Sequence, residues 1–405
     1  MNIEKFELEW WLNPYDAIAT HNMGSSCCKP MNMQELFELD GVSRDEVMDE
    51  IASMSLHYGY FEGMPRLKDA VAGLFETPQV AAENVMVVHG ATSANALTCY
   101  ALCEKGDNVI VVVPSYQQFV SIPAALGCEV RPYVSGPEDG FGINFRRLAD
   151  MVDGHTKAIF LTSPSNPTGY GMSREELEQL AAIARPVGAY VVCDEIYRGL
   201  TEGYAASIVD VYERGISTGG TSKVFSSAGL RIGWIVTRDL GLTHVIKNLR
   251  SFNTICESPI TELLAAIVLE HKEEIFARNR KICAEGPRRP ERVAQGPAAP
   301  PPGLRVAGLH ELPHLRLGHP DQGVLRGPLR QDRRARVPRH VLQHGARLPH
   351  RLRLRRRRVL QGGTRQARRV HREPERRPSY RVENRTQWRP ARSREPNALS
   401  IGAYG

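Results

Sequence analysis

Gly219-Gly-Thr-Ser-Lys-Val-Phe-Ser-Ser-Ala-Gly-Leu-Arg-Ile-Gly-Trp234 is the most informative stretch of this 405-residue chain. It places one lysine, Lys223, among small residues and one arginine, Arg231, eight positions later. A lysine amine is the side-chain group that condenses with an aldehyde. Such an amine must be partly neutral near pH 7. Since a lysine in water has a pKa of about 10.4, burial and nearby positive charge are expected to lower it. An isolated Ser-Lys would instead indicate an exposed surface lysine.

On both sides of this stretch, short apolar runs alternate with helical patterns. One of the helices opens with Ser173-Arg-Glu-Glu176, which has the form of a capping box. This alternation predicts an α/β domain with a mostly parallel sheet, in which ligands bind at the carboxyl ends of the strands. The apolar runs lie at residues 85–88, 109–113, 158–162, 190–193 and 232–236.

A polar motif follows each of the first four runs. Alone, each motif has an ordinary explanation: a strand–helix connection, a core or surface tyrosine, a proline turn, or an acidic pair at a strand end. In the first motif, Gly90 permits a close approach. The amides of Ala91 and Thr92 would lie at a helix N-terminus, which attracts phosphate. In chain order the motifs are His89-Gly-Ala-Thr-Ser-Ala94, Pro114-Ser-Tyr116, Asn166-Pro-Thr-Gly169 and Asp194-Glu-Ile-Tyr197.

Together, the order and approximate spacing of Asn166, Asp194, Lys223 and Arg231 resemble those of the class I/II aminotransferases, which are pyridoxal-phosphate (PLP) enzymes of fold type I. The stretch around Lys223 is similar to that family's S-x-S-K-x-F-x-x-x-G-x-R-x-G-W signature. It departs from the family at Gly220, where a Ser or Thr hydroxyl usually reaches the phosphate. The resemblance covers roughly residues 50–240, and its flank extends to residue 285.

The resemblance implies a role for each candidate residue. Lys223 would hold PLP as a Schiff base and, once freed, would move the α-proton of the substrate. Asp194 would pair with the pyridine nitrogen and keep it protonated, while Asn166 and Tyr197 would meet the phenolic oxygen. The remaining candidates are Tyr116, which would stack on the ring, and Gly90, Ala91, Thr92, Ser222 and Arg231, which would surround the phosphate.

A further candidate, Tyr58, comes from Tyr58-Gly-Tyr-Phe-Glu-Gly-Met-Pro-Arg-Leu67. This segment resembles the family's Y-x-x-x-x-G-x-x-x-L, whose tyrosine reaches the phosphate of the neighbouring subunit. The resemblance therefore implies a homodimer. Tyr60 is a competing assignment, and packing in a core would explain either tyrosine.

The implied reaction is PLP-dependent transfer of an amino group between an amino acid and a 2-oxo acid. A PLP-dependent lyase, cyclase or decarboxylase on the same fold is the alternative, because fold and cofactor do not fix the reaction.

Residues 286–405 differ chemically from the rest of the chain. They hold 29 arginines, no lysine and eight acidic residues, whereas residues 1–285 hold 23 basic and 37 acidic residues. They lack apolar periodicity, so we expect disorder there. An out-of-frame reading of a GC-rich gene would give this composition, and this is the favoured interpretation. The alternative from another class is a PLP-sensing protein with a basic tail that binds nucleic acid. The tail lacks zinc-finger spacing and basic-zipper heptads, so a nucleic-acid partner is not expected.

The expected domain organisation has three parts. Residues 1–50 would form an N-terminal arm and a portion of a small domain, residues 51–285 the PLP-binding large domain with the following helices, and residues 286–405 the basic segment. The small domain would then be incomplete. The N-terminus lacks a signal-peptide pattern, and no apolar run is long enough to cross a bilayer. We therefore expect a cytoplasmic protein without membrane contact. The eight cysteines include no CxxC pair, which predicts reduced thiols and no metal site.

Overall fold

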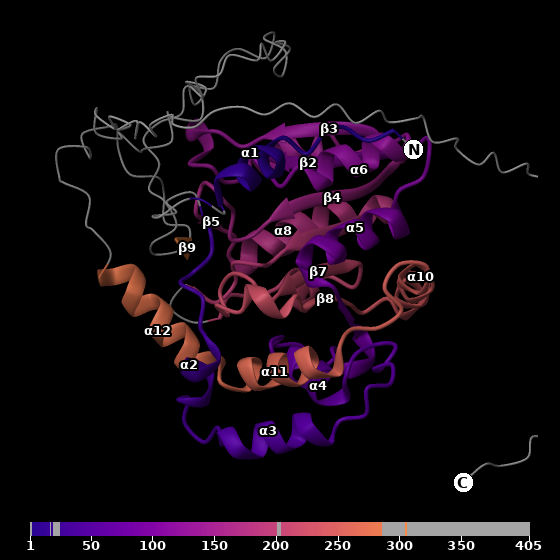
Figure 1. The fold of residues 1–405 in the computed structure, drawn as a ribbon. Coiled ribbons are helices and arrows are strands. Elements are labelled where there is room, and N and C mark those ends of the chain that lie inside the picture. Colours follow the sequence, from indigo (N-terminus) through magenta and orange to yellow (C-terminus); the bar gives the residue numbers. More distant parts are fainter. Residues whose placement is uncertain (1, 17, 19–24, 201–203, 286–303, 306–405) are drawn as a thin grey trace, which may run out of the picture. The chain divides into compact units, whose positions relative to one another are not determined.

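The computed structural model of the chain describes residues 2–16, 18, 25–200, 204–285 and 304–305. Their main feature is a seven-stranded sheet with the strand order β1-β8-β7-β6-β4-β2-β3 (Figure 1). Within this sheet only β8 is antiparallel to its neighbours, β1 and β7. The predicted α/β fold with a mostly parallel sheet is therefore confirmed. The strands are β1 (Val85–Val88), β2 (Asn108–Val113), β3 (Glu129–Val134), β4 (Thr156–Thr162), β6 (Tyr190–Asp194), β7 (Gly215–Gly220) and β8 (Gly233–Thr237).

All five predicted apolar runs are strands, with ends that differ from the prediction by no more than two residues. Two strands of this sheet were missed. β3 lies at the edge of the sheet, contains Pro132 and is largely exposed, so its sequence lacks a buried apolar run. β7 reads Gly-Ile-Ser-Thr-Gly-Gly and is fully buried. Three glycines give such a segment a weak strand signal, because glycine has low strand propensity.

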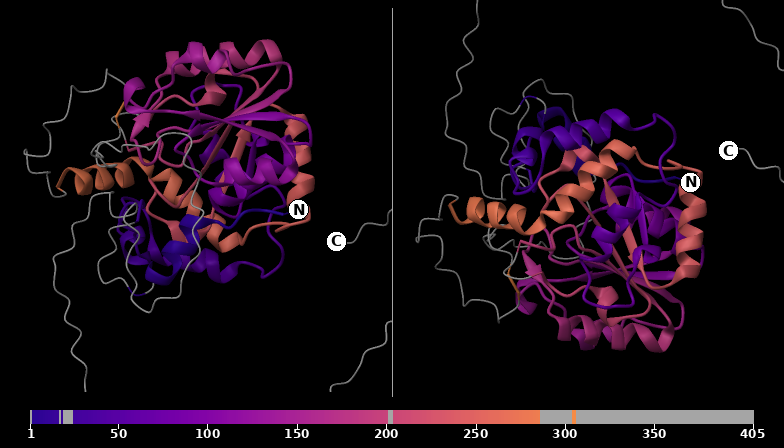
Figure 2. Two further views of the ribbon diagram at one scale, coloured as in Figure 1. Left: turned by 90° about the horizontal axis from the view of Figure 1, so that it is seen from above. Right: turned by 90° about the horizontal axis from the view of Figure 1, so that it is seen from below.

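Alternate residues of the buried strands point to opposite faces of the sheet, as the period of two requires. Val85 and Val87 belong to one apolar cluster, while Met86 and Val88 belong to the other. Helices cover both faces (Figure 2). One face packs against α5 (Gly90–Leu102), α6 (Gln118–Leu126) and α10 (Leu240–Ser251), and the other against α4 (Pro65–Ala72), α7 (Phe145–Ala149), α8 (Arg174–Ala184), α9 (Ile208–Val211) and α11 (Pro259–Glu270).

The start of α8 confirms the predicted capping box. Ser173 Oγ accepts a hydrogen bond from the Glu176 amide at 3.3 Å, and Glu176 Oε2 accepts one from the Ser173 amide at 2.8 Å. Two otherwise unpaired donors at the helix end are satisfied in this way.

The N-terminal segment supplies α1 (Glu7–Asp16), α2 (Met33–Phe37) and α3 (Arg44–Ser53), and α12 (Lys272–Glu285) follows α11. α4 lies beside α11, and Leu36 of α2 and Val47 of α3 join the same apolar cluster as α11 (Figure 1). The described residues 2–285 belong to one compact unit. The domain boundary expected near residue 50 stays a prediction.

The expectations for residues 286–405 fall outside the described residues, apart from β9 (Leu304–Arg305). This strand pairs with β5 (Tyr170–Gly171). In the part of the chain that the structure describes, none of the helices has the length and apolar character needed to cross a bilayer. The same residues contain no cluster of three side chains able to hold a metal ion.

Candidate active site

The predicted motifs meet at one edge of the sheet because of strand direction. β2, β4, β6 and β7 run in parallel, so the residues that follow them gather where these strands end. β1 has the same direction, since it is antiparallel to β8. The reversed strand β8 begins at this edge, and it thereby brings Arg231, two residues before its start, to the ends of the other strands.

Asp194 is the last residue of β6 and is only 5% exposed. Its Oδ2 accepts a hydrogen bond from Asn95 Nδ2 at 2.8 Å, and its Oδ1 accepts one from the Ile196 amide at 3.1 Å. Burial raises the pKa of Asp194 to about 6, although both hydrogen bonds act to lower it. The strand thus holds a carboxyl group whose ionisation falls near neutral pH.

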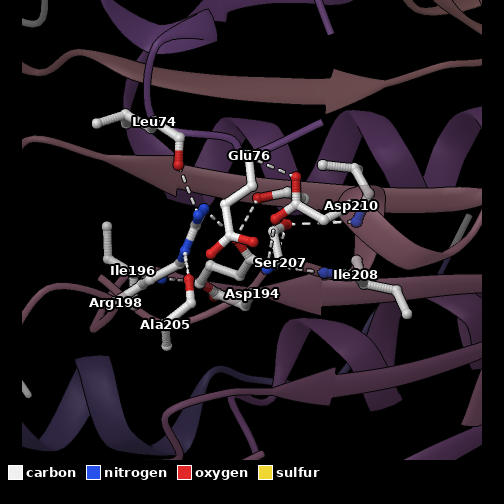
Figure 3. Close-up of polar contacts among 12 residues, drawn as sticks. Leu74, Glu76, Asp194, Ile196, Arg198, Ala205, Ser207, Ile208 and Asp210 are labelled. Carbon is white, nitrogen blue, oxygen red and sulfur yellow. Dashed lines mark hydrogen bonds and ion pairs between the residues drawn. The ribbon is translucent and has the colours of Figure 1, made fainter. Parts of the chain in front are cut away.

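The adjacent carboxylate, Glu195, serves a different network, which stabilises the fold. Glu195 Oε2 contacts Arg198 Nη1 at 3.0 Å and Ser217 Oγ at 2.8 Å, and Glu195 Oε1 accepts from Ser207 Oγ at 2.6 Å. Arg198 also donates to the backbone oxygens of Leu74 and Ala205 (Figure 3). Of the acidic pair, only Asp194 therefore remains available to a ligand.

Lys223 follows β7 and is half-buried. Its Nζ donates to Ser26 Oγ at 2.9 Å, contacts Cys27 Sγ at 3.3 Å and lies 6.0 Å from the centre of the Tyr197 ring. Burial acts to lower the pKa of Lys223, but the neighbouring Tyr197, Cys27 and Asp194 outweigh it, so that its pKa is raised. The expectation of a lowered pKa is wrong for the chain by itself, because these neighbours favour the charged ammonium.

Tyr197 and Asn166 come from different loops and meet as expected. Asn166 Nδ2 donates to Tyr197 Oη at 3.2 Å, and Tyr197 Oη donates to Ser26 Oγ at 2.9 Å. Ser26 therefore connects the Asn166–Tyr197 pair to Lys223. The structure thus brings Asn166, Tyr197 and Lys223 together at the strand ends.

Gly90 and Arg231, two residues of the predicted phosphate site, lie close together. Gly90 begins α5 with φ +74°, and a Cβ placed on it would lie 2.6 Å from Arg231 Nη2. Among the residues that the structure describes, no side chain caps the start of α5, which leaves the first-turn amides, including those of Ala91 and Thr92, open to an anion. Ser222, half-buried, lies in the turn between β7 and Arg231.

The glycine at position 220, where the chain departs from the family pattern, has a steric cause. A Cβ on Gly220 would lie 2.8 Å from the Ile232 oxygen, and one on Gly233 would lie 2.3 Å from the carbonyl carbon of Gly90. Contacts this short are not tolerated, so this strand pair is held close to the start of α5 by its lack of side chains.

Tyr116 lies next to the N-terminal segment. Its Oη donates to Glu9 Oε1 at 2.7 Å, and its ring lies 5.0 Å from that of Phe6. Burial, followed by the Glu9 carboxylate, raises the pKa of Tyr116. The role of Tyr116 as a stacking platform stays a prediction.

Tyr58 is a largely exposed side chain. It is 67% exposed, and it lines an open cavity formed by residues 54–59, 254 and 256–260. Its ring contacts that of His57, at 5.8 Å between ring centres. Among the described residues, Tyr58 makes no hydrogen bond or ring contact with Lys223, Tyr197 or Ser26.

Sequence reasoning missed three residues of the site: Asn95, Ser26 and Cys27. Asn95 carried a weak signal, since it is a polar residue between the apolar Ala94 and Leu97 of a buried helix. Ser26 and Cys27 carried none, because they reach Lys223 from almost 200 positions away in the chain.

Comparisons with known proteins place the chain in a family. The sequence profile of the family Aminotransferase class I and II matches residues 42–285. The tyrosine aminotransferase of Dictyostelium discoideum is 30% identical over 49% of this chain and 49% of its own length. The chain spans about half of the length of the first such relatives.

Two solved structures are similar in both sequence and fold. A PLP-dependent aminotransferase from Streptococcus suis is 35% identical, with a TM-score of 0.67 over 70% of this chain and 75% of that one. The PLP-dependent cyclase OrfR is 26% identical, with a TM-score of 0.63 over 70% of this chain and 73% of that one.

Proposed function

Because the chain belongs to the class I and II aminotransferase family, we propose that it binds pyridoxal 5′-phosphate and transfers an amino group between an amino acid and a 2-oxo acid. The observation that carries this proposal is the arrangement of Asp194, Tyr197, Lys223 and Arg231 at one edge of the sheet. Asp194 and Tyr197 come from the end of β6, and Lys223 and Arg231 from the connection between β7 and β8. Each has the chemistry that one part of the cofactor requires.

The residues present fit PLP on structural grounds. The uncapped start of α5 and the nearby guanidinium of Arg231 suit a phosphate, since a helix N-terminus and a planar cation both bind anions. The buried carboxyl of Asp194 suits a cationic ring nitrogen, which would favour its ionised form. The amine of Lys223 suits an aldehyde.

PLP, when bound, supplies an electron sink for the bonds to the substrate α-carbon. Asp194 would hold the proton on the ring nitrogen, while Tyr197 and Asn166 would orient the ring through its phenolic oxygen. Arg231, Ser222 and the amides of Ala91 and Thr92 would hold the phosphate. Lys223 would take the substrate α-proton and return it.

The direct test is an absorption spectrum of the purified full chain with added PLP. We expect a near-visible band in the wild-type protein and none in Lys223→Ala. Lys105→Ala, which changes an exposed lysine away from Lys223, Tyr197 and Ser26, is the matched control and should keep the band. An unchanged band in Lys223→Ala would refute the assignment.

A second candidate reaction, PLP-dependent cyclisation, is favoured by the similarity to OrfR. Both candidates use the same residues around the cofactor, so the products must separate them. Formation of a 2-oxo acid from an amino-acid donor supports transfer. A cyclised product with no 2-oxo acid supports the alternative.

We further propose that the functional unit is a homodimer. Support comes from exposed apolar side chains on the two chain segments that supply the lining of the cavity at Tyr58: Leu56, in the first segment, is 95% exposed, and Phe252, two residues before the second, is 86% exposed. Apolar groups gathered at one place are typical of an interaction surface. We call this set the apolar surface: Leu56, Tyr58, Tyr60, Phe61, Phe252 and Ile255.

A further inference from the structure

Ser26 occupies a central position that no motif predicted. It lies between α1 and α2 and is half-buried. Its Oγ accepts one hydrogen bond from Lys223 Nζ and another from Tyr197 Oη, each at 2.9 Å. One hydroxyl therefore contacts both the amine and the phenol on which the proposed function depends.

A serine hydroxyl is well suited to connect these two groups, because it has one proton to donate and two lone pairs to accept with. The Lys223 amine lies 6.0 Å from the centre of the Tyr197 ring. Hydrogen bonds from Lys223 Nζ and from Tyr197 Oη to Ser26 Oγ connect the two residues. On its other side, Tyr197 Oη accepts a hydrogen bond from Asn166 Nδ2 at 3.2 Å.

We propose that Ser26 is a positioning residue whose hydroxyl passes a proton between Lys223 and Tyr197. The inference deepens the proposed function and rests on it, since it concerns how the reacting amine gains and loses its proton. When Tyr197 is a phenolate, an N–H bond of the Lys223 ammonium breaks and a new O–H bond forms at Ser26. At the same time the original Ser26 proton moves to Tyr197 Oη. The products are a neutral amine and a phenol, with no change in total charge and no oxidation.

Other groups around Lys223 also influence its titration. Cys27 Sγ lies 3.3 Å from Nζ, and Asp194 and Tyr197 add negative charge when ionised. The effect of Ser26 must therefore be measured as a difference between variants. Removing its acceptor oxygen should destabilise the ammonium and lower the pKa of Lys223.

The test uses the full chain without cofactor. Acetylation by acetic anhydride attacks only the neutral amine, so its rate at Lys223, followed by peptide mass spectrometry across pH, reports the titration of that amine. In Ser26→Ala we expect the midpoint to fall by about one pH unit, the scale of a lost hydrogen bond to a charged group. Ser26→Thr, which keeps the hydroxyl, and Ser251→Ala, which changes the exposed last residue of α10, should keep the wild-type midpoint.

The Tyr197→Phe background provides the decisive comparison, because a bridge needs both ends. There, Ser26→Ala should shift the midpoint by less than half as much as in the wild type. Equal shifts in both backgrounds, a wild-type midpoint in Ser26→Ala, or equal shifts in Ser26→Ala and Ser26→Thr would each overturn the inference. Loss of cooperative thermal unfolding in Ser26→Ala would do so too, because it would indicate a purely structural role. This readout does not need PLP, so a failure of the proposed function, seen as no near-visible band, is distinguishable from a failure here.

Discussion

Asn95 of α5 holds the side chain of Asp194, the last residue of β6, through a hydrogen bond. Its Nδ2 donates to Asp194 Oδ2 at 2.8 Å, while its Oδ1 accepts from Thr218 Oγ1 at 2.6 Å. All three side chains are buried. The carboxyl group on which the proposed chemistry depends is thus held by α5, which precedes Asp194 in the chain, and by β7, which follows it.

Asn95→Leu should destabilise the protein more at pH 7.5 than at pH 4.5. At the higher pH Asp194 is ionised, and a lost hydrogen bond to a buried charge costs about 2 kcal/mol. At pH 4.5 the carboxyl group of Asp194 is neutral, so loss of the hydrogen bond from Asn95 lowers the free energy of unfolding by less. Urea denaturation measures the difference. Thr98→Val on the same helix is the control, because the buried Thr98 Oγ1 has no hydrogen-bond partner among the described residues and its removal should cost little. Equal costs of Asn95→Leu at both pH values would contradict the assignment.

Asp194→Asn should stabilise the cofactor-free protein at pH 7.5 while removing most of its turnover. Burial raises the pKa of Asp194 from 3.8 to about 6, so the folded state binds this proton more tightly than the unfolded state. The stabilising contribution is complete below pH 3.8 and is lost as the pH rises through 6. The variant avoids a loss of about 3 kcal/mol at pH 7.5. Denaturation at both pH values checks the sign, and a gain that persists at pH 3.5 would argue against it.

Gly90→Ala should weaken PLP binding about tenfold or more, equivalent to about 1.4 kcal/mol. The added Cβ would meet Arg231 Nη2 at 2.6 Å and would force the guanidinium away from the start of α5. Gly106→Ala is the matched control, since Gly106 also has a positive φ but has no atom within 4 Å of an added Cβ. Both variants should lose similar backbone stability. Titration of the near-visible band should find weaker binding only in Gly90→Ala.

Phe252→Glu should convert the proposed dimer into a monomer. Phe252 is 86% exposed in the single chain and belongs to the apolar surface, where burying a carboxylate against a second copy would be unfavourable. Sedimentation equilibrium of the full chain measures the change. Val134→Glu is the control, because Val134 is also exposed but lies on the edge strand β3. A wild-type protein that is monomeric at all concentrations would remove the dimer from the proposal.

The sequence was sufficient for the parts of the site that are local. Asn166 and Asp194 lie just after or at the ends of β4 and β6, whose buried residues form recognisable apolar runs, and Lys223 lies within its own sequence motif. It was insufficient where contacts are distant in the chain. Ser26 meets Lys223 through tertiary packing alone, and β7 is a strand because its neighbours β6 and β8 bury it, despite its three glycines. The raised pKa of Lys223 was also out of reach, since it depends on which side chains surround the amine.

The reversal of β8 has a consequence for how the protein is made on the ribosome. β1 is the first strand to be synthesised, but its neighbour in the sheet is β8, and Val88 pairs with Gly233, 145 positions later. At typical rates of translation this partner emerges roughly 10 to 30 seconds after β1. Until then the apolar residues of β1 lack their place in the sheet, and Gly90 lacks Arg231. The proposed phosphate site is therefore assembled only when the last strand of the sheet arrives, so nascent chains that end before β8 should be unable to retain the proposed cofactor.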